Sequence, residues 1–189
     1  MERALIVSCT KKSVTFFSEI LNAASINQIV VLSTAGEARR LLLEQDFDLV
    51  IVDSPLQDES GENLSRYISY KDLSQVILAV KSEHFNAISA VCESDGVLAV
   101  SKPVNIDIFW HALSLAKSAG SRIKRFRDEN ERLKQKIEDI KIVDRAKLIL
   151  ISCMNMNEKD AHKYIEKQAM DKRSSKRAIS EEILKTYEN

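Results

Sequence analysis

Short apolar runs alternate with longer amphipathic stretches through the first half of the chain. Five runs rich in Val, Ile and Leu lie at residues 4–7, 29–32, 47–52, 76–80 and 97–100. Each is followed by apolar residues at helical spacing, which is the pattern of βαβ units. Because the runs lack polar alternation, we expect strands covered on both faces, as in a parallel sheet. The pattern predicts an α/β domain with a five-stranded doubly wound sheet over residues 1–118.

The hydrophobic period changes after Pro103. Residues 105–145 carry an apolar stripe in alternating steps of three and four residues, the spacing of a and d positions in a coiled coil. Asn130 falls on an a position, where a buried Asn favours two parallel strands in register. The seam predicted for a homodimer consists of Ile123, Phe126, Asn130, Leu133, Ile137 and Ile140. The alternative is a single helix docked on its own domain, with Asn130 exposed.

Three shorter helical stretches follow, at residues 144–151, 157–169 and 178–184. Asn157 begins the second of them in the manner of an N-cap, with Asp160 three residues later. Each stretch alone is short for stability in water, so we expect them to pack together. The predicted organisation is therefore an α/β domain (1–118), a coiled-coil linker helix (119–143) and a small all-α three-helix domain (144–189).

The net charge is zero, but the two parts of the chain differ in sign. Residues 1–121 hold 10 basic and 15 acidic residues, and residues 122–189 hold 18 basic and 13 acidic residues. This asymmetry indicates that only the second part meets a polyanion, although a solvated helical face of mixed charge also explains it.

The cysteines and the hydropathy indicate a cellular compartment. Cys9, Cys92 and Cys153 are scattered and odd in number, which suits a reducing cytosol better than disulfides or a metal site. No window approaches the length of a membrane span, and the N-terminus lacks a secretory apolar region. We expect a cytoplasmic protein without a membrane partner.

Polar residues follow the apolar runs where the strands of an open α/β sheet form sites. Asp53 follows the third run, Gly61 comes eight residues later, and Lys102-Pro103 follows the fifth. With the order of elements, these residues resemble the receiver domains of response regulators over residues 3–118. The resemblance implies that Asp53 accepts a phosphoryl group from a sensor kinase with Mg²⁺ help, while Lys102 contacts the phosphate. On the residues alone, Asp53 and Lys102 could equally form a structural ion pair.

The chain departs from receivers at several positions. Receivers carry an acidic pair after the first strand, where this chain has Ser8 and Cys9. Mg²⁺ prefers hard anionic oxygens, and Asp53 alone makes a poor cage. Val80 stands for the hydroxyl residue expected after the fourth strand, and Ala99 for the switch aromatic. We therefore expect no bound cofactor or metal, and a pseudo-receiver that packs, dimerises or reads another signal.

The tail carries a second resemblance. Its segments are Ala146-Lys147 with the apolar run to Ile151, residues 157–164, Gln168-Ala169-Met170, Arg173 and residues 175–179. Together with the receiver-like domain and the coiled coil, they resemble the ANTAR family of RNA-binding antitermination regulators over about residues 125–184. The family usually has Gly after Ala-Lys, where this chain has Leu148. The resemblance implies a dimer that binds paired hairpin loops in nascent transcripts and blocks a terminator.

Basic residues in the tail are candidates for RNA contact. Four of them cluster in six residues beside a helix N-terminus, which favours phosphate. Ala161 would let a base or backbone approach closely. The predicted RNA-binding residues are Lys172, Arg173, Lys176, Arg177, Ala161 and Lys147. A charged interhelical loop explains the cluster as well on sequence alone, and the stripe Lys159, Lys163 and Lys167 is interpreted as a solvated face.

Other function classes are less well supported. The main alternative is a pseudo-receiver that recruits another protein and binds no nucleic acid. DNA binding lacks a convincing recognition helix. An enzyme is not expected, because the chain has no Gly-rich phosphate loop, no Cys/His pair at ligand spacing and no motif around a nucleophilic Ser.

Overall fold

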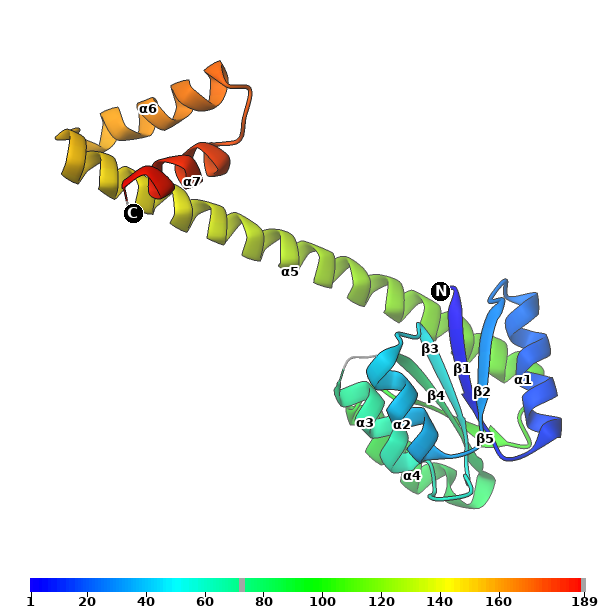
Figure 1. Ribbon diagram of the computed structural model, residues 1–189. Coiled ribbons are helices and arrows are strands. Elements are labelled where there is room, and N and C mark those ends of the chain that lie inside the picture. The colour runs from blue at the N-terminus through cyan, green and yellow to red at the C-terminus, as the bar shows by residue number, and fades with distance from the viewer. Residues whose placement is uncertain (72–73, 188–189) are drawn as a thin grey trace. The chain divides into compact units, whose positions relative to one another are not determined.

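The computed structural model describes residues 1–71 and 74–187 (Figure 1). The chain divides into two compact units, Met1–Lys124 and Arg125–Asn189. One helix, α5 (Ile106–Met154), contributes its first part to the first unit and its remainder to the second. In the described part of the chain, no helix is long and apolar enough to cross a membrane.

The first unit contains the predicted five-stranded parallel sheet. Its strands pair in the order β2-β1-β3-β4-β5, and every neighbouring pair is parallel. The strands are β1 (Arg3–Val7), β2 (Gln28–Leu32), β3 (Leu49–Asp53), β4 (Gln75–Lys81) and β5 (Leu98–Lys102). The parallel sheet expected from the uninterrupted apolar runs is confirmed, and β1 and β3 are almost wholly buried. The edge strand β2 is partly exposed, so it is not covered on both faces as expected.

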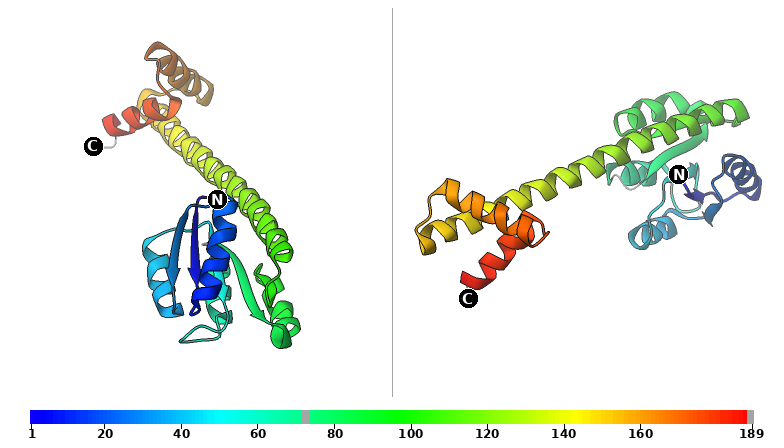
Figure 2. Two further views of the ribbon diagram at one scale, coloured as in Figure 1. Left: turned by 90° about the vertical axis from the view of Figure 1, so that its right-hand side faces the viewer. Right: turned by 90° about the horizontal axis from the view of Figure 1, so that it is seen from above.

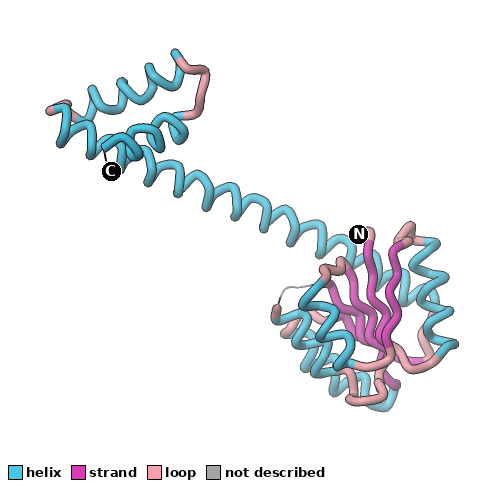
Figure 3. The backbone as a smooth tube through the Cα atoms, viewed as in Figure 1, coloured by secondary structure: helices cyan, strands magenta, loops and turns pink. Residues whose placement is uncertain are grey.

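Helices cover both faces of this sheet (Figures 2 and 3). They are α1 (Lys11–Ala23), α2 (Ala35–Glu44), α3 (Glu62–Tyr70), α4 (Ser82–Ser94) and the start of α5. One face packs on α2, α3 and α4, and the other packs on α1 and α5. Alternate residues of each strand enter the two cores, as the pleat requires: Leu5 lies in one and Ile6 in the other.

Helix α5 is longer than the pattern predicted. It continues without a break through Met154, so residues 144–151 are its last turns and not a separate helix. The start of the predicted heptad stripe is core, because Phe109, Ala112 and Ala116 are buried against the sheet. Gly120 allows close packing here, since a Cβ at this position would lie 3.0 Å from the Met1 methyl carbon.

The second unit is a three-helix arrangement. The end of α5 packs with α6 (Glu158–Asp171) and α7 (Lys176–Tyr187). Its buried core consists of Ala146, Leu150, Ala161, Ile165, Ala169, Ile179 and Ile183. Asn157 caps α6 as predicted, because its side-chain oxygen accepts a hydrogen bond from the Asp160 backbone N–H at 2.9 Å.

Candidate functional site

Asp53 closes β3 at the carboxyl edge of the sheet, and its side chain is only 1% exposed. The Ser8 hydroxyl donates a hydrogen bond to Asp53 Oδ2 at 2.7 Å, and the Thr10 hydroxyl lies 3.4 Å from the same oxygen. Asp53 Oδ1 forms an ion pair with the Lys102 ammonium group, which also donates to the Ser54 carbonyl. Oδ2 therefore has hydroxyl partners from the protein, whereas the buried Oδ1 accepts no hydrogen bond and is balanced by the charge of Lys102 alone.

This environment does not fit a resident Mg²⁺ ion. Ser8 offers a neutral hydroxyl that already binds Asp53, and the Cys9 thiol is a soft ligand directed at the Pro55 carbonyl, 3.4 Å away. Among the side chains that the structure describes (residues 1–71, 74–92 and 94–187), no group of three His, Cys, Asp or Glu is arranged to hold a metal. The arrangement satisfies a buried carboxylate, and it lacks the anionic cage that neutralises a transferring phosphoryl group.

The first hydroxyl group after the fourth strand belongs to Ser82. β4 extends to Lys81, so Val80 lies buried inside the strand and Ser82 follows it. The Ser82 hydroxyl donates to the Lys102 carbonyl, and the Ser101 hydroxyl donates to Ser82 Oγ at 3.1 Å. A hydroxyl group is thus present at this edge, where it bonds to β5.

Two acidic residues after β3 have structural roles that sequence reasoning missed. Asp58 accepts hydrogen bonds from the backbone N–H groups of Ala35 and Gly36 at 2.8 and 2.9 Å. These bonds at the start of α2 hold the pKa of Asp58 below its usual value. Glu59 binds Arg39 at 2.8 Å and accepts from the Leu64 N–H. Neither carboxylate replaces the missing acidic pair.

In the second unit, most of the predicted basic cluster is held in ion pairs. Lys172 pairs with Glu182, Lys176 with Glu166, and Arg177 with both Asp139 and Glu181, at 2.5 to 2.8 Å. The Lys176 ammonium group lowers the pKa of Glu166, and the Arg177 guanidinium lowers the pKa of Asp139. Two of these pairs, Lys176–Glu166 and Arg177–Asp139, join different helices, and such exposed ion pairs contribute modestly to the stability of the three-helix unit.

Arg173 is the exception in that cluster. It is exposed, and the described part of the chain shows no ion pair for it. It adopts a left-handed backbone conformation (φ 51°) two residues after α6 ends. This conformation turns the chain between α6 and α7.

The two remaining candidates are less accessible than expected. Ala161 is fully buried in the three-helix core, so its methyl group cannot contact RNA in this arrangement, and the expectation of a close RNA approach there is wrong. Lys147 has a side chain only 16% exposed and pairs with Asp144 at 2.7 Å and Glu158 at 3.7 Å. The hydrogen bond from Lys147 to Asp144 raises the pKa of Lys147.

The stripe along α6 carries more accessible positive charge. Lys159, Lys163 and Lys167 follow one another at four-residue intervals and are all exposed. No ion pair with another described side chain involves any of the three. The sequence interpretation treated them as a solvated face, and the sequence could not show that the neighbouring cluster would be neutralised instead.

The middle of α5 exposes an apolar seam. Phe126, Leu133, Ile137 and Ile140 are 48–69% exposed, Asn130 is exposed between them, and Ile123 is half-buried. Exposed apolar side chains at heptad spacing are typical of a helix that pairs with another helix.

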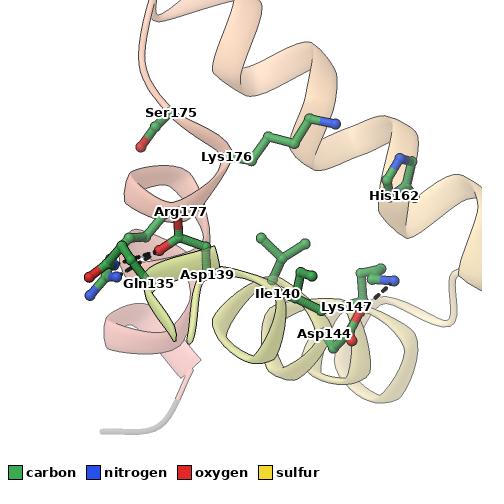
Figure 4. Close-up of a pocket in the computed structure, with 10 residues that line it drawn as sticks. Gln135, Asp139, Ile140, Asp144, Lys147, His162, Ser175, Lys176 and Arg177 are labelled. Atoms are coloured by element: carbon green, nitrogen blue, oxygen red, sulfur yellow. Dashed lines mark hydrogen bonds and ion pairs between the residues drawn. The ribbon is translucent and has the colours of Figure 1, made fainter. Parts of the chain in front are cut away.

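A cavity of about 530 Å³ lies between the three helices of the second unit (Figure 4). It is lined by Gln135, Asp139, Ile140, Val143, Asp144, Lys147, His162, Ser175, Lys176 and Arg177. These residues include three of the predicted RNA-binding cations, and no sequence pattern indicated a cavity.

Known proteins resemble both units of the chain. Residues 131–184 match the ANTAR domain family. The chain is 27% identical over 139 residues to the transcriptional regulatory protein PdtaR of Mycobacterium tuberculosis, covering 74% of this chain and 68% of PdtaR. This alignment is longer than either compact unit.

Solved structures share the fold of the first unit. A signal receiver domain of an HD domain-containing protein from Pseudomonas fluorescens matches with a TM-score of 0.57 at 20% identity, covering 66% of this chain and 92% of that one. The receiver domain of a LuxO repressor protein from Vibrio parahaemolyticus matches with a TM-score of 0.55 at 21% identity, covering 65% and 95%.

Proposed function

The chain belongs to the ANTAR-domain response regulators, and from this premise we propose that it binds hairpin RNA and promotes transcription antitermination in the cytoplasm. RNA is bound by the Arg125–Asn189 unit of a homodimer. The receiver-like unit passes on a signal from another protein without Mg²⁺-dependent phosphorylation of Asp53. The observation that carries the proposal is the ANTAR match over residues 131–184.

The distribution of exposed charge supports RNA binding. Lys159, Lys163, Lys167 and Arg173 supply positive charge that the described residues leave without ion pairs. Unpaired loops present both phosphates and splayed bases, so a small basic helical unit can contact them. The charge asymmetry of the chain fits this assignment, since the excess of basic residues lies in the second part of the chain and the first part is acidic.

The test is a titration of the full chain with a two-hairpin RNA carrying small, purine-containing loops, at several salt concentrations. The triple variant Lys159→Gln/Lys163→Gln/Lys167→Gln should bind more weakly and lower the slope of log affinity against log salt by about 2, near 0.7 for each lost contact. Its matched control is Lys172→Gln/Lys176→Gln/Arg177→Gln, which removes the ion-paired cations.

Each outcome of this titration has a distinct meaning. If the control variant lowers the slope of log affinity against log salt more than the stripe variant does, the RNA contacts lie in the ion-paired cluster. Equal affinity for duplex DNA would favour the DNA-binding alternative. Failure of the wild-type chain to bind RNA, both intact and as residues 119–189, would contradict the proposal and favour a protein-interaction module.

Dimerisation through the apolar seam is part of the proposal. Ile137 is 53% exposed and lies on the seam, whereas Lys136 is an exposed neighbour outside it. We expect Ile137→Gln to weaken self-association at least tenfold in sedimentation equilibrium, because a second polar group would be buried at an a-type position of the seam. Lys136→Gln, beside the seam, should weaken self-association far less than Ile137→Gln does. Equal self-association of the two variants would show that the seam does not form the dimer contact.

A further inference from the structure

Most of the excess positive charge in the second part of the chain lies on α5. Residues 122–141 hold eight basic and five acidic residues, whereas residues 142–189 hold ten basic and eight acidic residues. Four of the cations on α5 stand in six residues that contain no carboxylate: Arg122, Lys124, Arg125 and Arg127. These four residues form a basic run that precedes residues 131–184, the segment that matches the ANTAR family.

The basic run faces solvent beside the apolar seam. All four of its side chains are exposed, and Phe126 of the seam lies among them with 69% of its surface exposed. Neither Arg122 nor Arg125 forms an ion pair with another described side chain. Glu129, the carboxylate one turn after Arg125, lies 3.9 Å from Arg132 instead. The positive charge of the run is therefore not neutralised by its own helix.

Dimerisation through the seam brings two basic runs together. With Asn130 at an a position, Arg122 occupies a g position and Arg127 an e position. In a parallel dimer in register, each g residue lies opposite the e residue five positions later on the other helix. Arg122 of each copy therefore faces Arg127 of the second copy, and like charges in such contacts oppose association.

The next two g positions differ from this one. Glu129 faces Lys134 of the second copy, which is an attractive contact. Lys136 faces Lys141 of the second copy, and Lys141 is already paired with Glu138 of its own helix at 2.8 Å. Arg122 has no such partner among the described side chains, so the repulsion between the copies is greatest at the basic run.

A polyanion relieves this repulsion, because its phosphates neutralise cations of both copies at once. We propose that the basic runs of two copies form one site for RNA backbone phosphates, so that RNA binding strengthens the dimer. This site rests on the proposed RNA binding and adds to it residues that precede the family match. Because coupling between two binding equilibria is reciprocal, the dimer also binds RNA more tightly than the monomer does.

The experiment reverses one charge of the run and measures two equilibria of the full-length chain. Arg122→Glu turns the like-charge contact with Arg127 of the second copy into an attractive one. Arg122→Gln only removes the charge, and Lys12→Glu makes the same charge change at an exposed position of α1. Sedimentation equilibrium without RNA gives the dimer affinity. Titration with the two-hairpin RNA at several salt concentrations, with each chain well above its dimer dissociation constant, gives the RNA affinity. Thermal unfolding checks that each variant is folded.

The two equilibria should move in opposite directions. Arg122→Glu should tighten the dimer about tenfold, because two repulsive contacts become attractive. It should bind RNA about tenfold more weakly and lower the slope of log affinity against log salt by about 1.4, near 0.7 for each copy. Arg122→Gln should lie between this variant and the wild type, and Lys12→Glu should match the wild type in both measurements. Since phosphates carry no sequence information, hairpins with altered loops should show the same fold loss.

Three results would overturn the inference. If the wild-type chain binds RNA and Arg122→Glu binds it equally well, the basic run contacts no phosphate, although the proposed function stands. If Arg122→Glu does not tighten the dimer, the two basic runs do not face each other and RNA binding has no repulsion to relieve. If the wild-type chain binds no RNA, the proposed function fails and the phosphate site fails with it, whatever the dimer affinity.

Discussion

The two units of this protein handle charge in opposite ways. The first buries one carboxylate, Asp53, and surrounds it with Ser8 and Lys102, so that it is satisfied within the protein. The second keeps its charges at the surface, where some join helices and others, such as Lys163, stay unpaired among the described residues.

This difference shows that a chain can keep the receiver-like fold while it lacks the side chains that receiver chemistry needs. The receiver-like sheet depends on buried apolar runs, which are intact, whereas Mg²⁺ chemistry depends on a few carboxylates at the strand ends. The three-helix unit has a small core, and its ion pairs stabilise it while its exposed cations can meet a polyanion.

The largest expected effect tests whether the units unfold separately. Ile165→Ala should lower the free energy of unfolding of the three-helix unit by about 4 kcal/mol, because it leaves a cavity in a small core. The transition of the first unit should stay in place in urea unfolding followed by circular dichroism and Trp110 fluorescence. The control Met170→Ala, at a side chain 78% exposed, should change stability by about 0.5 kcal/mol or less. A single shared transition that moves with Ile165→Ala would show that the units are coupled.

Because Asp53 is buried and Lys102 is partly exposed, we expect removal of the two charges to cost different amounts of stability. Lys102→Met should destabilise the first unit by about 3 kcal/mol, because it leaves a buried carboxylate with hydroxyl partners alone. Asp53→Asn should cost about 1 kcal/mol, since Lys102 is 25% exposed in its side chain and can reach water. Urea unfolding measures both, and equal losses would contradict the buried-charge explanation.

Restoring the acidic pair should restore metal binding. In Ser8→Asp/Cys9→Asp three carboxylates meet at the sheet edge, so the variant should be less stable than wild type without Mg²⁺. A hundredfold excess of Mg²⁺ over its dissociation constant should then stabilise it by about 2.7 kcal/mol. Thermal unfolding with and without MgCl₂ measures this, with Ser8→Asn/Cys9→Asn as the control. If Mg²⁺ stabilised the wild-type chain as much as this variant, the conclusion that the Asp53 site does not fit Mg²⁺ would be wrong.

The smallest effect concerns pH and the ion pairs between the helices of the second unit. The pKa values of Asp139 and Glu166 are lowered in the folded chain, so their contribution to stability is complete above the usual carboxylate pKa, about 4. It is lost as pH falls through the lowered values, where the folded carboxylates take up protons. Asp139→Asn/Glu166→Gln should therefore melt lower than wild type at pH 7, and the difference should vanish in strong acid. A difference that persists at low pH would show that packing, not charge, is responsible.

Several structural features were readable from local pattern. The five strands follow from uninterrupted apolar runs, because a segment covered on both faces must be apolar on both. The cap at Asn157 follows from a short-range contact with Asp160. The apolar run at residues 76–80 lies within β4, which extends to Gln75 and Lys81 because these residues pair with β3 and β5.

The break predicted in α5 was wrong for a different reason. Its apolar face changes direction near residue 140, which resembles the end of one helix and the start of another. The backbone of α5 stays helical through this region. Before residue 140 its apolar side chains are exposed in the seam, and after it they pack against α6 and α7. A change in the phase of the pattern therefore marked a change of partner.

The sequence by itself determined the receiver-like sheet, the acidic and basic parts of the chain, and the motif segments that match the ANTAR family. These properties depend on which residues are near one another along the chain. Only the tertiary structure decided that Ala161 is core, that Lys176 and Arg177 are neutralised, and that Ser8 and Lys102 close around Asp53. Each of those outcomes depends on side chains brought from distant elements, and both the burial of a side chain and the strength of an ion pair depend on distances and surroundings that exist only once the elements are placed.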